Sequence, residues 1–307
     1  MVSVESIVTD ILSSALRLLP LYLFAGLGEI ISEKSGVVNL GIEGQMLITA
    51  LVTLIVDVAT GNPIIAVLSA VTVSLLISSV YGFLTVKIGF DQIVSGLAFY
   101  LFGLGFSYVL YSKFVLGPFT NFQPIHIPLL SDIPFVGPVI FAQNPFVYIA
   151  ILFVPAIYIF MDRTSFGMCI KAVGENPVAA DNMGINVNRV RFLSVLFGGI
   201  ATGLAGAYFE VGFLQNFQFN VIGGRGFVAL ALIYFANWSP LKTLFGAFIY
   251  NVVDSAQSEF VSIAGPAFQT SSQLFAMLPY LFLLALIPLF GRRARPPKYL
   301  MVPYRKK

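Results

Sequence analysis

The chain has 307 residues, of which 58% are apolar and 10% charged, and its mean hydropathy is +0.90. A soluble domain carries about 25% charged residues, so this composition excludes a protein that covers its whole surface in water and predicts a polytopic membrane protein. Glu5 and Asp10 stand where a signal peptide would be positively charged, so we expect the first apolar segment to be retained. With one cysteine and one histidine, the chain lacks the residues for an internal disulfide or a cysteine metal cluster, and a haem or metalloenzyme site is disfavoured.

A membrane-spanning helix needs about 20 mainly apolar residues. We therefore expect an all-α fold of about nine transmembrane helices, with broken or short helices around a central path. The expected segments are 11–32, 38–59, 63–86, 92–112, 145–161, 192–213, 225–238, 241–259 and 272–290. The segment 225–238 is short, which indicates a broken or partly re-entrant helix.

The basic residues predict the orientation of the chain. Seven of the 17 Lys and Arg residues lie in the tail 291–307 and four in the loop 162–191, whereas the Pro-rich loop 113–144 holds only Lys113. Because cytoplasmic segments are enriched in Lys and Arg, we expect the tail and the loop 162–191 inside the cell and the loop 113–144 outside. Counting spans then gives an external N-terminus and a cytoplasmic C-terminus. Three further basic residues also fall on inner turns: Lys34, Lys87 and Lys242.

The segment GEIISEKSGVVNLGIEGQM, residues 28–46, interrupts an apolar region with glycine, serine and polar side chains. Irregular backbone at membrane depth is tolerated only where protein or a water-filled cavity surrounds it, and broken helices line many transport paths. A simple cytoplasmic turn at 33–36 would explain Glu33 and Lys34. It would not explain the polar residues that continue into the next apolar segment, which are Asn39, Glu43 and Gln45.

A second Gly-rich break precedes the short apolar helix in residues 220–250. Gly223, Gly224 and Gly226 allow sharp turns there, and Arg225 is either an interface anchor or structural pair, or a partner for an anionic group. The stretch that begins at Gly226 repeats the order glycine, apolar helix, Asn/Pro turn and second helix that also begins at Gly44. With the two turns on opposite sides of the membrane, this order is typical of an inverted repeat with a site between its halves.

Carboxylates within apolar segments are costly, so their positions carry information. Asp57, Asp254 and Glu259 lie near or within spans; we place Asp57 and Glu259 at interfaces. Glu29, Glu43 and Glu210 are candidates for a wet interior. The full set of candidate path residues is Glu29, Asn39, Glu43, Gln45, Glu210, Gly223, Gly224 and Gly226. The small residues of FGGIATGLAGAYFE predict close packing of helix backbones.

The polar stretch AVGENPVAADNMGINVNRVRF, residues 172–192, predicts a short helix with both ends marked. Asn176 can cap the first turn, Pro177 suits the first helical position, and Gly184 suits the left-handed residue that ends a helix. A helix of two turns is not stable alone in water. It is therefore either an ordinary connector or a docking surface for a cytoplasmic partner.

Several motifs of energy-using and hydrolytic proteins are missing. No Gly-Lys dipeptide occurs, so no Walker A loop can hold nucleotide phosphates. Neither a Gly-x-Ser-x-Gly elbow nor a His-Glu-x-x-His site is present. Uphill transport would then take its energy from an ion gradient or from another subunit, and the docking helix favours the second.

Three stretches, SEKSGVVNLGIEGQM, AVGENPVAADNMGINVNRVR and GRGFVALALIYFANWSPL, occur in this order and span most of the chain. Together they resemble the permease family of ATP-binding-cassette importers that includes ribose, branched-chain amino acid and nucleoside permeases. Within that family, NLGIEG and GRGFVALA are most similar to the nucleoside and simple-sugar branch. The resemblance implies one transmembrane permease domain over residues 1–291, in a prokaryotic cell membrane, followed by a basic cytoplasmic tail, 292–307.

The resemblance also implies that the loop 162–191 carries a coupling helix, which inserts into a cleft of a cytoplasmic ATPase. The matching positions are Gly174, Glu175, Asn176, Pro177, Ala179, Ala180 and Gly184. Small side chains at positions 179 and 180 would allow close approach of the partner. Gly174→Trp or Ala180→Trp should then leave the permease folded but uncouple ATP hydrolysis from transport.

Further partners implied by the resemblance are a second, similar but non-identical permease subunit and an external solute-binding protein that meets the loop 113–144. The chain itself would be no enzyme, with no catalytic residue, cofactor or metal, and it would bind no nucleic acid; ATP and Mg²⁺ would be used by the ATPase. The main alternative is a carrier driven by protons or sodium through Glu29, Glu43 or Glu210. A membrane-embedded enzyme or channel is disfavoured by the missing motifs.

Overall fold

The computed structural model describes residues 4–114, 120–214, 220–264, 272–290 and 294–305, and it has the expected all-α class. The helices are α1 (Val4–Lys34), α2 (Ile42–Thr60), α3 (Pro63–Gly82), α4 (Gln92–Lys113), α5 (Pro145–Arg163), α6 (Ser165–Glu175), α7 (Pro177–Asn182), α8 (Val187–Tyr208), α9 (Arg225–Phe235), α10 (Pro240–Ala264), α11 (Ser272–Phe275) and α12 (Leu278–Phe290). The π-helical segments are η1 (Phe83–Ile88), η2 (Gly137–Phe141) and η3 (Phe209–Phe213). Two short strands, β1 (Ile125–His126) and β2 (Ala142–Gln143), pair antiparallel.

Six helical stretches among the described residues are long and apolar enough to cross a membrane. They are Val4–Lys34, Ile42–Thr60, Pro63–Ile88, Gln92–Lys113, Pro145–Arg163 and Val187–Phe213. These stretches agree with the expectation of a multi-pass membrane protein. The later segments α9, α10 and α12 are helical as expected but are not among the six, so the count of about nine spans remains a prediction.

Several long helices begin at residues that satisfy the free amides of the first turn. The side chain of Asn62 accepts hydrogen bonds from the backbone at the start of α3, and that of Asn144 does the same for α5. Each is followed by a proline, Pro63 or Pro145, whose missing N–H costs nothing at the first helical position. Asp91 caps α4 in the same way. The sequence thus specifies where these three helices start.

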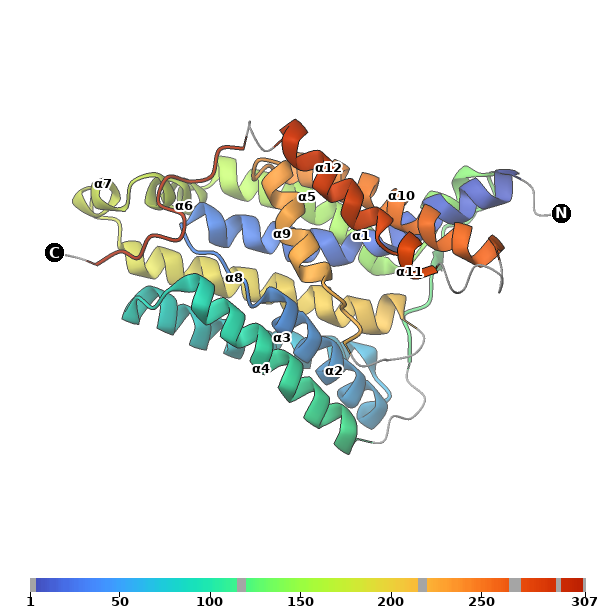
Figure 1. Cartoon of the computed structure of the whole chain (residues 1–307), viewed down its shortest axis with the longest axis horizontal. Helices are drawn as coiled ribbons and strands as arrows, with labels where there is room; N and C mark the ends of the chain where they lie inside the picture. The colour runs from blue at the N-terminus through green and yellow to red at the C-terminus, as the bar shows by residue number, and fades with distance from the viewer. Residues whose placement is uncertain (1–3, 115–119, 215–219, 265–271, 291–293, 306–307) are drawn as a thin grey trace.

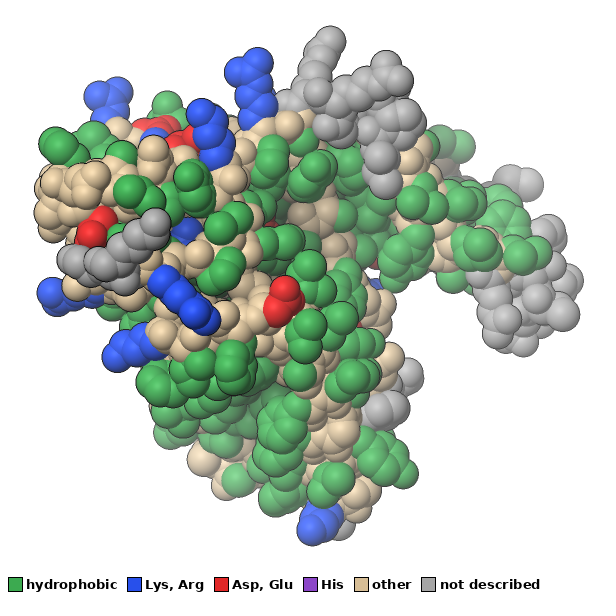
Figure 2. All heavy atoms as spheres, turned by 60° about the vertical axis from the view of Figure 1, so that its left-hand side comes forward, with side chains coloured by type: hydrophobic (Ala, Val, Ile, Leu, Met, Phe, Trp, Pro, Cys, Tyr) green, Lys and Arg blue, Asp and Glu red, His purple; other side chains and the backbone are tan. Residues whose placement is uncertain are grey.

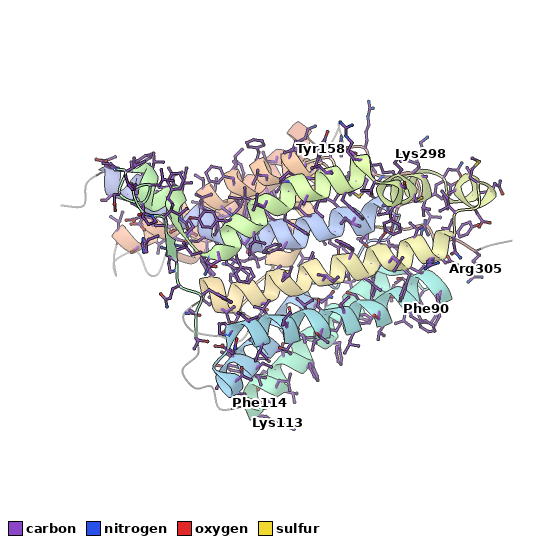
Figure 3. The ribbon with its side chains drawn as sticks, turned by 180° about the vertical axis from the view of Figure 1, so that it is seen from behind. Phe90, Lys113, Phe114, Tyr158, Lys298 and Arg305 are labelled. Atoms are coloured by element: carbon purple, nitrogen blue, oxygen red, sulfur yellow. The ribbon has the colours of Figure 1, made fainter. Side chains whose placement is uncertain are left out.

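The helices run roughly along the long axis of the molecule (Figure 1). α1 begins at the end where the N-terminus lies and finishes at the other end, next to α6, α7 and the C-terminal residues. We call the latter the α7 end and the former the opposite end. Figure 3 shows Phe90, Lys298 and Arg305 toward the α7 end and Lys113 with Phe114 at the opposite end.

α1 and α8 form the centre of the bundle, and they approach closely because both carry small residues. A Cβ atom on Gly28 of α1 would lie 2.5 Å from the Cβ of Ala201. On another face of α8, a Cβ on Gly199 would lie 2.2 Å from the hydroxyl of Ser78 in α3. The close packing predicted for residues 197–210 is therefore present. From Leu18 onward almost every residue of α1 is buried.

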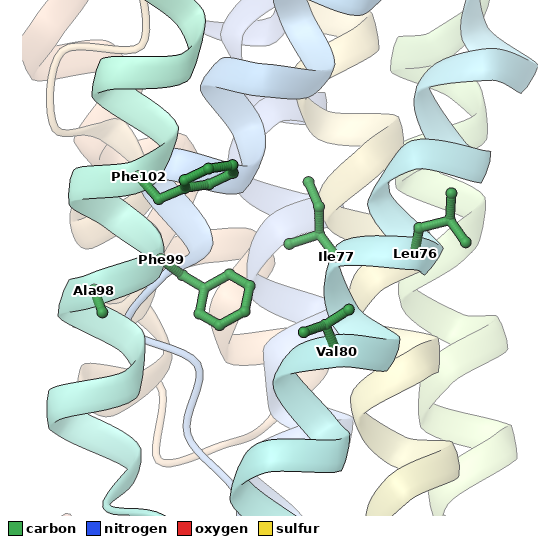
Figure 4. A pocket seen from close by; sticks show the side chains of 6 residues that line it. All are labelled: Leu76, Ile77, Val80, Ala98, Phe99 and Phe102. Atoms are coloured by element: carbon green, nitrogen blue, oxygen red, sulfur yellow. The ribbon is translucent and has the colours of Figure 1, made fainter.

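The outer surface of α3, α4 and α5 is apolar, as hydrocarbon requires. Large side chains such as Leu68, Leu101 and Leu152 are each more than 60% exposed. A groove of about 480 Å³ between α3 and α4 is almost wholly apolar (Figure 4) and suits lipid chains better than a polar solute. Figure 2 shows hydrophobic side chains over most of the visible face, with Lys and Arg gathered mainly at the α7 end.

The contact between α2 and α4 depends on two facing glycines, and a matched pair of substitutions tests it. A Cβ on Gly103 would lie 2.5 Å from the Cα of Gly44, whereas a Cβ on Gly105 would meet nothing within 4 Å. We expect Gly103→Ala to cost about 1–3 kcal/mol by overpacking and to lower the melting temperature of the purified protein by several degrees. Gly105→Ala should leave it unchanged or raise it slightly, since alanine favours a helix. Equal shifts for the two variants would contradict this packing.

Candidate functional site

The chain between α1 and α2 passes from the α7 end into the interior without regular structure. α1 ends at Lys34, and the turn that follows contains Gly36, whose φ of 99° is unfavourable for other residues. The following residues are buried although their backbone is irregular; Val37 is 0% and Val38 4% exposed. α2 then begins at Ile42, inside the bundle. The segment predicted to be a break therefore starts with a turn at the α7 end and continues, buried and irregular, to the start of α2.

Side chains from neighbouring helices satisfy the backbone of this segment. The N–H of Val38 donates to Oε1 of Gln92 in α4 (2.9 Å), and the hydroxyl of Tyr81 in α3 donates to the Val38 carbonyl. The hydroxyl of Ser32 donates to the Val37 carbonyl (2.8 Å). In a medium without water, each unsatisfied backbone group would cost several kcal/mol. These three side chains allow the break to exist at membrane depth.

Asn39 and Gln45 belong to one polar network that joins α2, α3 and α8. The amide of Asn39 donates to the side-chain carbonyl of Gln45 (3.1 Å), and its own carbonyl accepts from the N–H of Gly41 (3.0 Å). The amide nitrogen of Gln45 lies 2.7 Å from the hydroxyls of both Ser74 and Ser78. The structure thus brings these two candidate residues together and gives them partners within the protein.

Glu43 connects the first break to the second. One carboxylate oxygen accepts from the N–H of Gly224 and the other from the N–H of Gly226, each at 2.7 Å. These amides belong to the N-terminus of α9, where free N–H groups and the helix dipole favour a negative charge. A Cβ on Gly226 would lie 2.8 Å from the Glu43 carboxylate, so glycine is needed for this approach.

α2 and α9 leave this junction in opposite directions. α2 extends to the opposite end, where the carboxylate of Asp57 accepts from the backbone N–H of Thr120 (2.6 Å). α9 extends to the α7 end, where the indole of Trp238 donates to Glu33. The opposed directions agree with the predicted inverted repeat. With 11 residues, α9 is about 16 Å long and covers about half of a 30 Å hydrocarbon core.

The other candidate residues near α9 have different surroundings. Gly223 and Gly224 have φ values of 60° and 89° and form the turn before the helix. The guanidinium of Arg225 donates to the carbonyl of Ile222 (3.1 Å) and lies 5.2 Å from the ring centre of Phe209. The side chain of Arg225 is therefore paired within the protein in this conformation. This agrees with the alternative of a structural role, as opposed to a partner for an anionic group.

The carboxylates Glu29 and Glu210 do not share one site. Glu29 is buried in α1, where a Cβ on Gly198 of α8 would lie 3.6 Å from its carboxylate, and its Oε2 has no hydrogen-bond partner in the described part of the chain. Glu210 lies in η3 and is fully buried, and neither of its carboxylate oxygens has a hydrogen-bond partner in the described part of the chain. Its charged neighbour is Asp57, at the opposite end. Glu210 is thus separate from the Glu43 junction.

The helix predicted in residues 172–192 is present as α7, with the expected caps. The side chain of Asn176 accepts from the N–H of Ala179 (3.0 Å), and Pro177 occupies the first helical position. At the other end, Gly184 has a φ of 84°, and the N–H of Ile185 donates to the carbonyl of Ala180 (3.0 Å). This pattern is a Schellman motif. Both ends of α7 are therefore fixed by local hydrogen bonds.

The structure corrects the expected contact surface of α7. Ala180 is 4% exposed and packs into the hydrophobic core, while Val178 is 53% and Met183 83% exposed. Gly174 lies in α6 and is also buried; a Cβ there would lie 2.1 Å from the carbonyl oxygen of Lys34. Tryptophan at position 174 or 180 would therefore disrupt the fold of this end, so the expectation that such variants stay folded is wrong.

Several residues of these sites were missed in the sequence. They are Ser32, Ser74, Ser78, Tyr81, Gln92, Arg191 and Trp238. All of them except Ser32 act on a segment far away in the chain; Gln92, for example, lies 54 residues from Val38. No local pattern marks such a partner. The only available signal was a polar side chain inside an apolar segment, which applies to Ser74 and Ser78.

The chain belongs to the permease family described as the branched-chain amino acid transport system permease component, whose model matches residues 11–287. It is similar to the "Putative glucose ABC transporter permease protein TsgC13" of Haloferax volcanii (35% identity; 84% of this chain and 80% of the relative). It is similar to the guanosine ABC transporter permease protein NupQ of Bacillus subtilis (33%; 94% and 93%) and to the nucleoside ABC transporter permease protein NupC of Lactococcus lactis (30%; 90% and 90%). The same Haloferax strain has a second relative, the glucose ABC transporter permease protein TsgB13 (26%; 82% and 70%). No solved structure matches.

These findings confirm the resemblance drawn from the three sequence stretches, including the nucleoside and simple-sugar branch. The chain is a permease of the ATP-binding-cassette importer class. The comparisons do not favour the alternative of a carrier driven by an ion gradient. The buried breaks and the capped surface helix are thus features of a transport subunit.

The double hydrogen bond at Glu43 predicts a local effect of Glu43→Gln. An amide side chain keeps one acceptor oxygen but places an NH₂ group against the second backbone N–H. A hydrogen bond to a charged group contributes about 1.5–3 kcal/mol, so the first turn of α9 should open more often. Hydrogen exchange followed by mass spectrometry should show at least about tenfold faster exchange there. Glu5→Gln, at an exposed carboxylate, is the control, and equal exchange in the two variants would contradict the junction.

Proposed function

We propose that this chain forms the membrane path of an importer for nucleosides or simple sugars and transmits the work of ATP from a separate ATPase. The observation that carries the coupling part is α7, a short helix capped at both ends that exposes Val178 and Met183. A rigid apolar projection on an otherwise polar loop fits a cleft in a protein partner. The solute class is supported by the guanosine, nucleoside and glucose named for the relatives.

The α7 end faces the cytoplasm in this proposal, and the N-terminus and the loop 113–144 face outside. The basic residues support this orientation: the tail 291–307 and the loop 162–191 hold eleven of the 17 Lys and Arg residues, seven plus four. The described part of the tail, 294–305, and the loop 162–191 lie at the α7 end (Figure 1). The N-terminus lies at the opposite end, as an odd number of crossings requires.

The seven positions carried over to the coupling loop then divide into two groups. Asn176, Pro177, Ala180 and Gly184 fix the shape of α7, and Gly174 fixes its base. Glu175 and Ala179 are exposed and can contact the ATPase. In this proposal, the main contact with the ATPase comes from Val178 and Met183. The family resemblance did not assign a coupling role to these two positions.

The remaining subunits follow from the class of transporter. ATP and Mg²⁺ bind to the ATPase, and this chain performs no covalent chemistry and needs no cofactor. A solute-binding protein delivers the solute to the loop 113–144. The second permease is a different chain; the two Haloferax relatives TsgC13 and TsgB13, with related names, support a pair of non-identical permeases.

The path runs beside the junction of α2 and α9, in our proposal. Glu43 is 1% and Asn39 4% exposed, so the structure represents a closed state at this point. Opening separates α9 from Glu43, which exposes the amides of Gly224 and Gly226 to water or to the hydroxyl groups of the solute. Glu29 and Gln45 line the α2 side of the same junction, whereas Glu210 acts elsewhere.

Reconstitution tests the function as a whole. The permease pair and its ATPase are placed in proteoliposomes and supplied with the solute-binding protein. They should take up labelled guanosine or glucose only when ATP is present on the side of the membrane that the ATPase faces. A proton and sodium ionophore should leave uptake unchanged. Uptake without ATP that the ionophore abolishes would overturn the proposal and support the gradient-driven carrier.

The exposure of α7 predicts a loss of assembly in Met183→Glu. Burying a new carboxylate in an apolar cleft is unfavourable, so the ATPase should no longer co-purify with the permease, while the yield and melting temperature of the permease stay unchanged. The control is Leu129→Glu, because Leu129 is equally exposed (85% against 83%) but lies in the loop 113–144. If the Met183→Glu variant still co-purifies with the ATPase, α7 is not part of the docking surface.

A further inference from the structure

The C-terminal residues 294–305 do not form a free basic tail. They cross the α7 end as a strap, with a turn at residues 298–301, that touches the connections between the spans. Their hydrogen bonds run from the N–H of Arg295 to Asn237 (2.7 Å), from the N–H of Tyr299 to the carbonyl of Gly174 (3.0 Å), and from the N–H of Met301 to the carbonyl of Gly36 (3.1 Å). Near its end, the strap passes within about 4 Å of a Cβ on Gly89, through Pro303 and Arg305.

These contacts belong to four different connections at one end of the bundle. Asn237 lies between α9 and α10, and Gly174 lies in the loop that carries α7. Gly36 begins the first break, and Gly89 lies between α3 and α4. Figure 3 shows Lys298 above α6 and Arg305 close to Phe90, so the strap extends from one side of this end to the other. One segment of chain therefore ties together parts that are otherwise joined only through the helices.

Arg191 holds the strap to the first break. It lies in the first turns of α8, directly after the α7 loop, and is only 2% exposed. Its Nε donates to the carbonyl of Ser35 (3.0 Å), and its Nη1 donates to the carbonyl of Val302 (2.8 Å). The planar guanidinium reaches both carbonyls at once, which the single ammonium group of a lysine cannot do.

We propose that Arg191 and the strap 294–305 are a rigid brace that positions the α7 loop against the first break, so that movement of α7 moves residues 35–41. The argument concerns stiffness. α7 is a small projection, and coupling between distant sites requires a contiguous network of packed or hydrogen-bonded groups. The strap supplies this network through Gly174 at the base of α7 and Gly36 at the start of the break. This inference rests on the proposed function of α7.

The test measures transport per ATP hydrolysed in the reconstituted complex. Tyr299→Pro removes the N–H that binds Gly174, and Arg191→Lys removes one of the two carbonyl contacts. Both variants should bind the ATPase and retain its hydrolysis rate, while transport per ATP falls at least about tenfold. The matched controls are Tyr299→Ala, which keeps the N–H, and Arg189→Lys, at an exposed arginine of the same helix. Both controls should transport normally.

A crosslink tests the rigidity. A Cβ on Gly89 lies 4.0 Å from the Cβ of Pro303, within the range of a disulfide. In a Cys169→Ser background, Gly89→Cys with Pro303→Cys should form the bond on oxidation. Because Gly89 has a φ of 80°, cysteine there is strained, so the reduced form of the same variant is the reference, and coupling should be equal in the oxidised and reduced forms. Loss of transport on oxidation that returns on reduction would show a strap that must move, and would overturn the brace.

The outcomes separate this inference from the proposed function. If the unaltered chain binds no ATPase, the proposed function itself fails before any strap variant is compared. If the ATPase binds but Tyr299→Pro and Arg191→Lys keep the normal ratio of transport to hydrolysis, the brace is wrong and the function stands. If both variants release the ATPase while staying folded, the strap is part of the docking surface and does not act as a positioning element.

Discussion

Two hydrogen bonds between the Glu43 carboxylate and the first amides of α9 join the two interrupted regions of the helix bundle. A half-length helix that ends inside a membrane leaves its N-terminal amides without water, and each would cost several kcal/mol if unpaired. A carboxylate pays the cost of its own burial only when it is well bonded, and here the amides of Gly224 and Gly226 and the dipole of α9 provide that. The carboxylate and the amides therefore satisfy each other's hydrogen bonds, which allows both to be buried. The bond also fixes where α2 begins, which in turn requires the irregular segment 35–41 and its partners Gln92 and Tyr81.

Hydrogen bonds and close packing make the α7 end rigid. α7 is closed at both ends by local hydrogen bonds, its base at Gly174 packs against the end of α1, and Arg191 ties α8 to two main-chain carbonyls. The fold therefore has one region of fixed geometry, at the α7 end, and one region of polar hydrogen bonds, where the helices are interrupted. Small shifts at the first region have to be taken up at the second, since a packed interior deforms very little.

The sequence allowed some of these features to be predicted and not others, for a physical reason. Caps, prolines and glycines act within a few residues, so α7, both breaks and the small-residue face of α8 could be read directly. The sequence did not show which side of a spanning helix is buried in the protein. In a helix that is apolar on every side, no periodicity distinguishes the buried face from the lipid face. Gly174 and Ala180 were placed on the surface for another reason: the resemblance assigned them to the coupling loop, and helices as short as α6 and α7 have too few turns to show which side is buried. The strap was missed because main-chain donors such as the N–H of Tyr299 carry no side-chain signal at all.

The position of Glu43 also constrains how the junction can open. Withdrawing α9 leaves a carboxylate and two amides without partners, and hydrocarbon cannot replace them. Water, or a solute that carries both hydrogen-bond donors and acceptors, can pair with the two amides and the carboxylate at the same time. In our proposal, opening of the junction therefore needs water or a polar solute there. A lipid or an apolar molecule would leave these groups without partners.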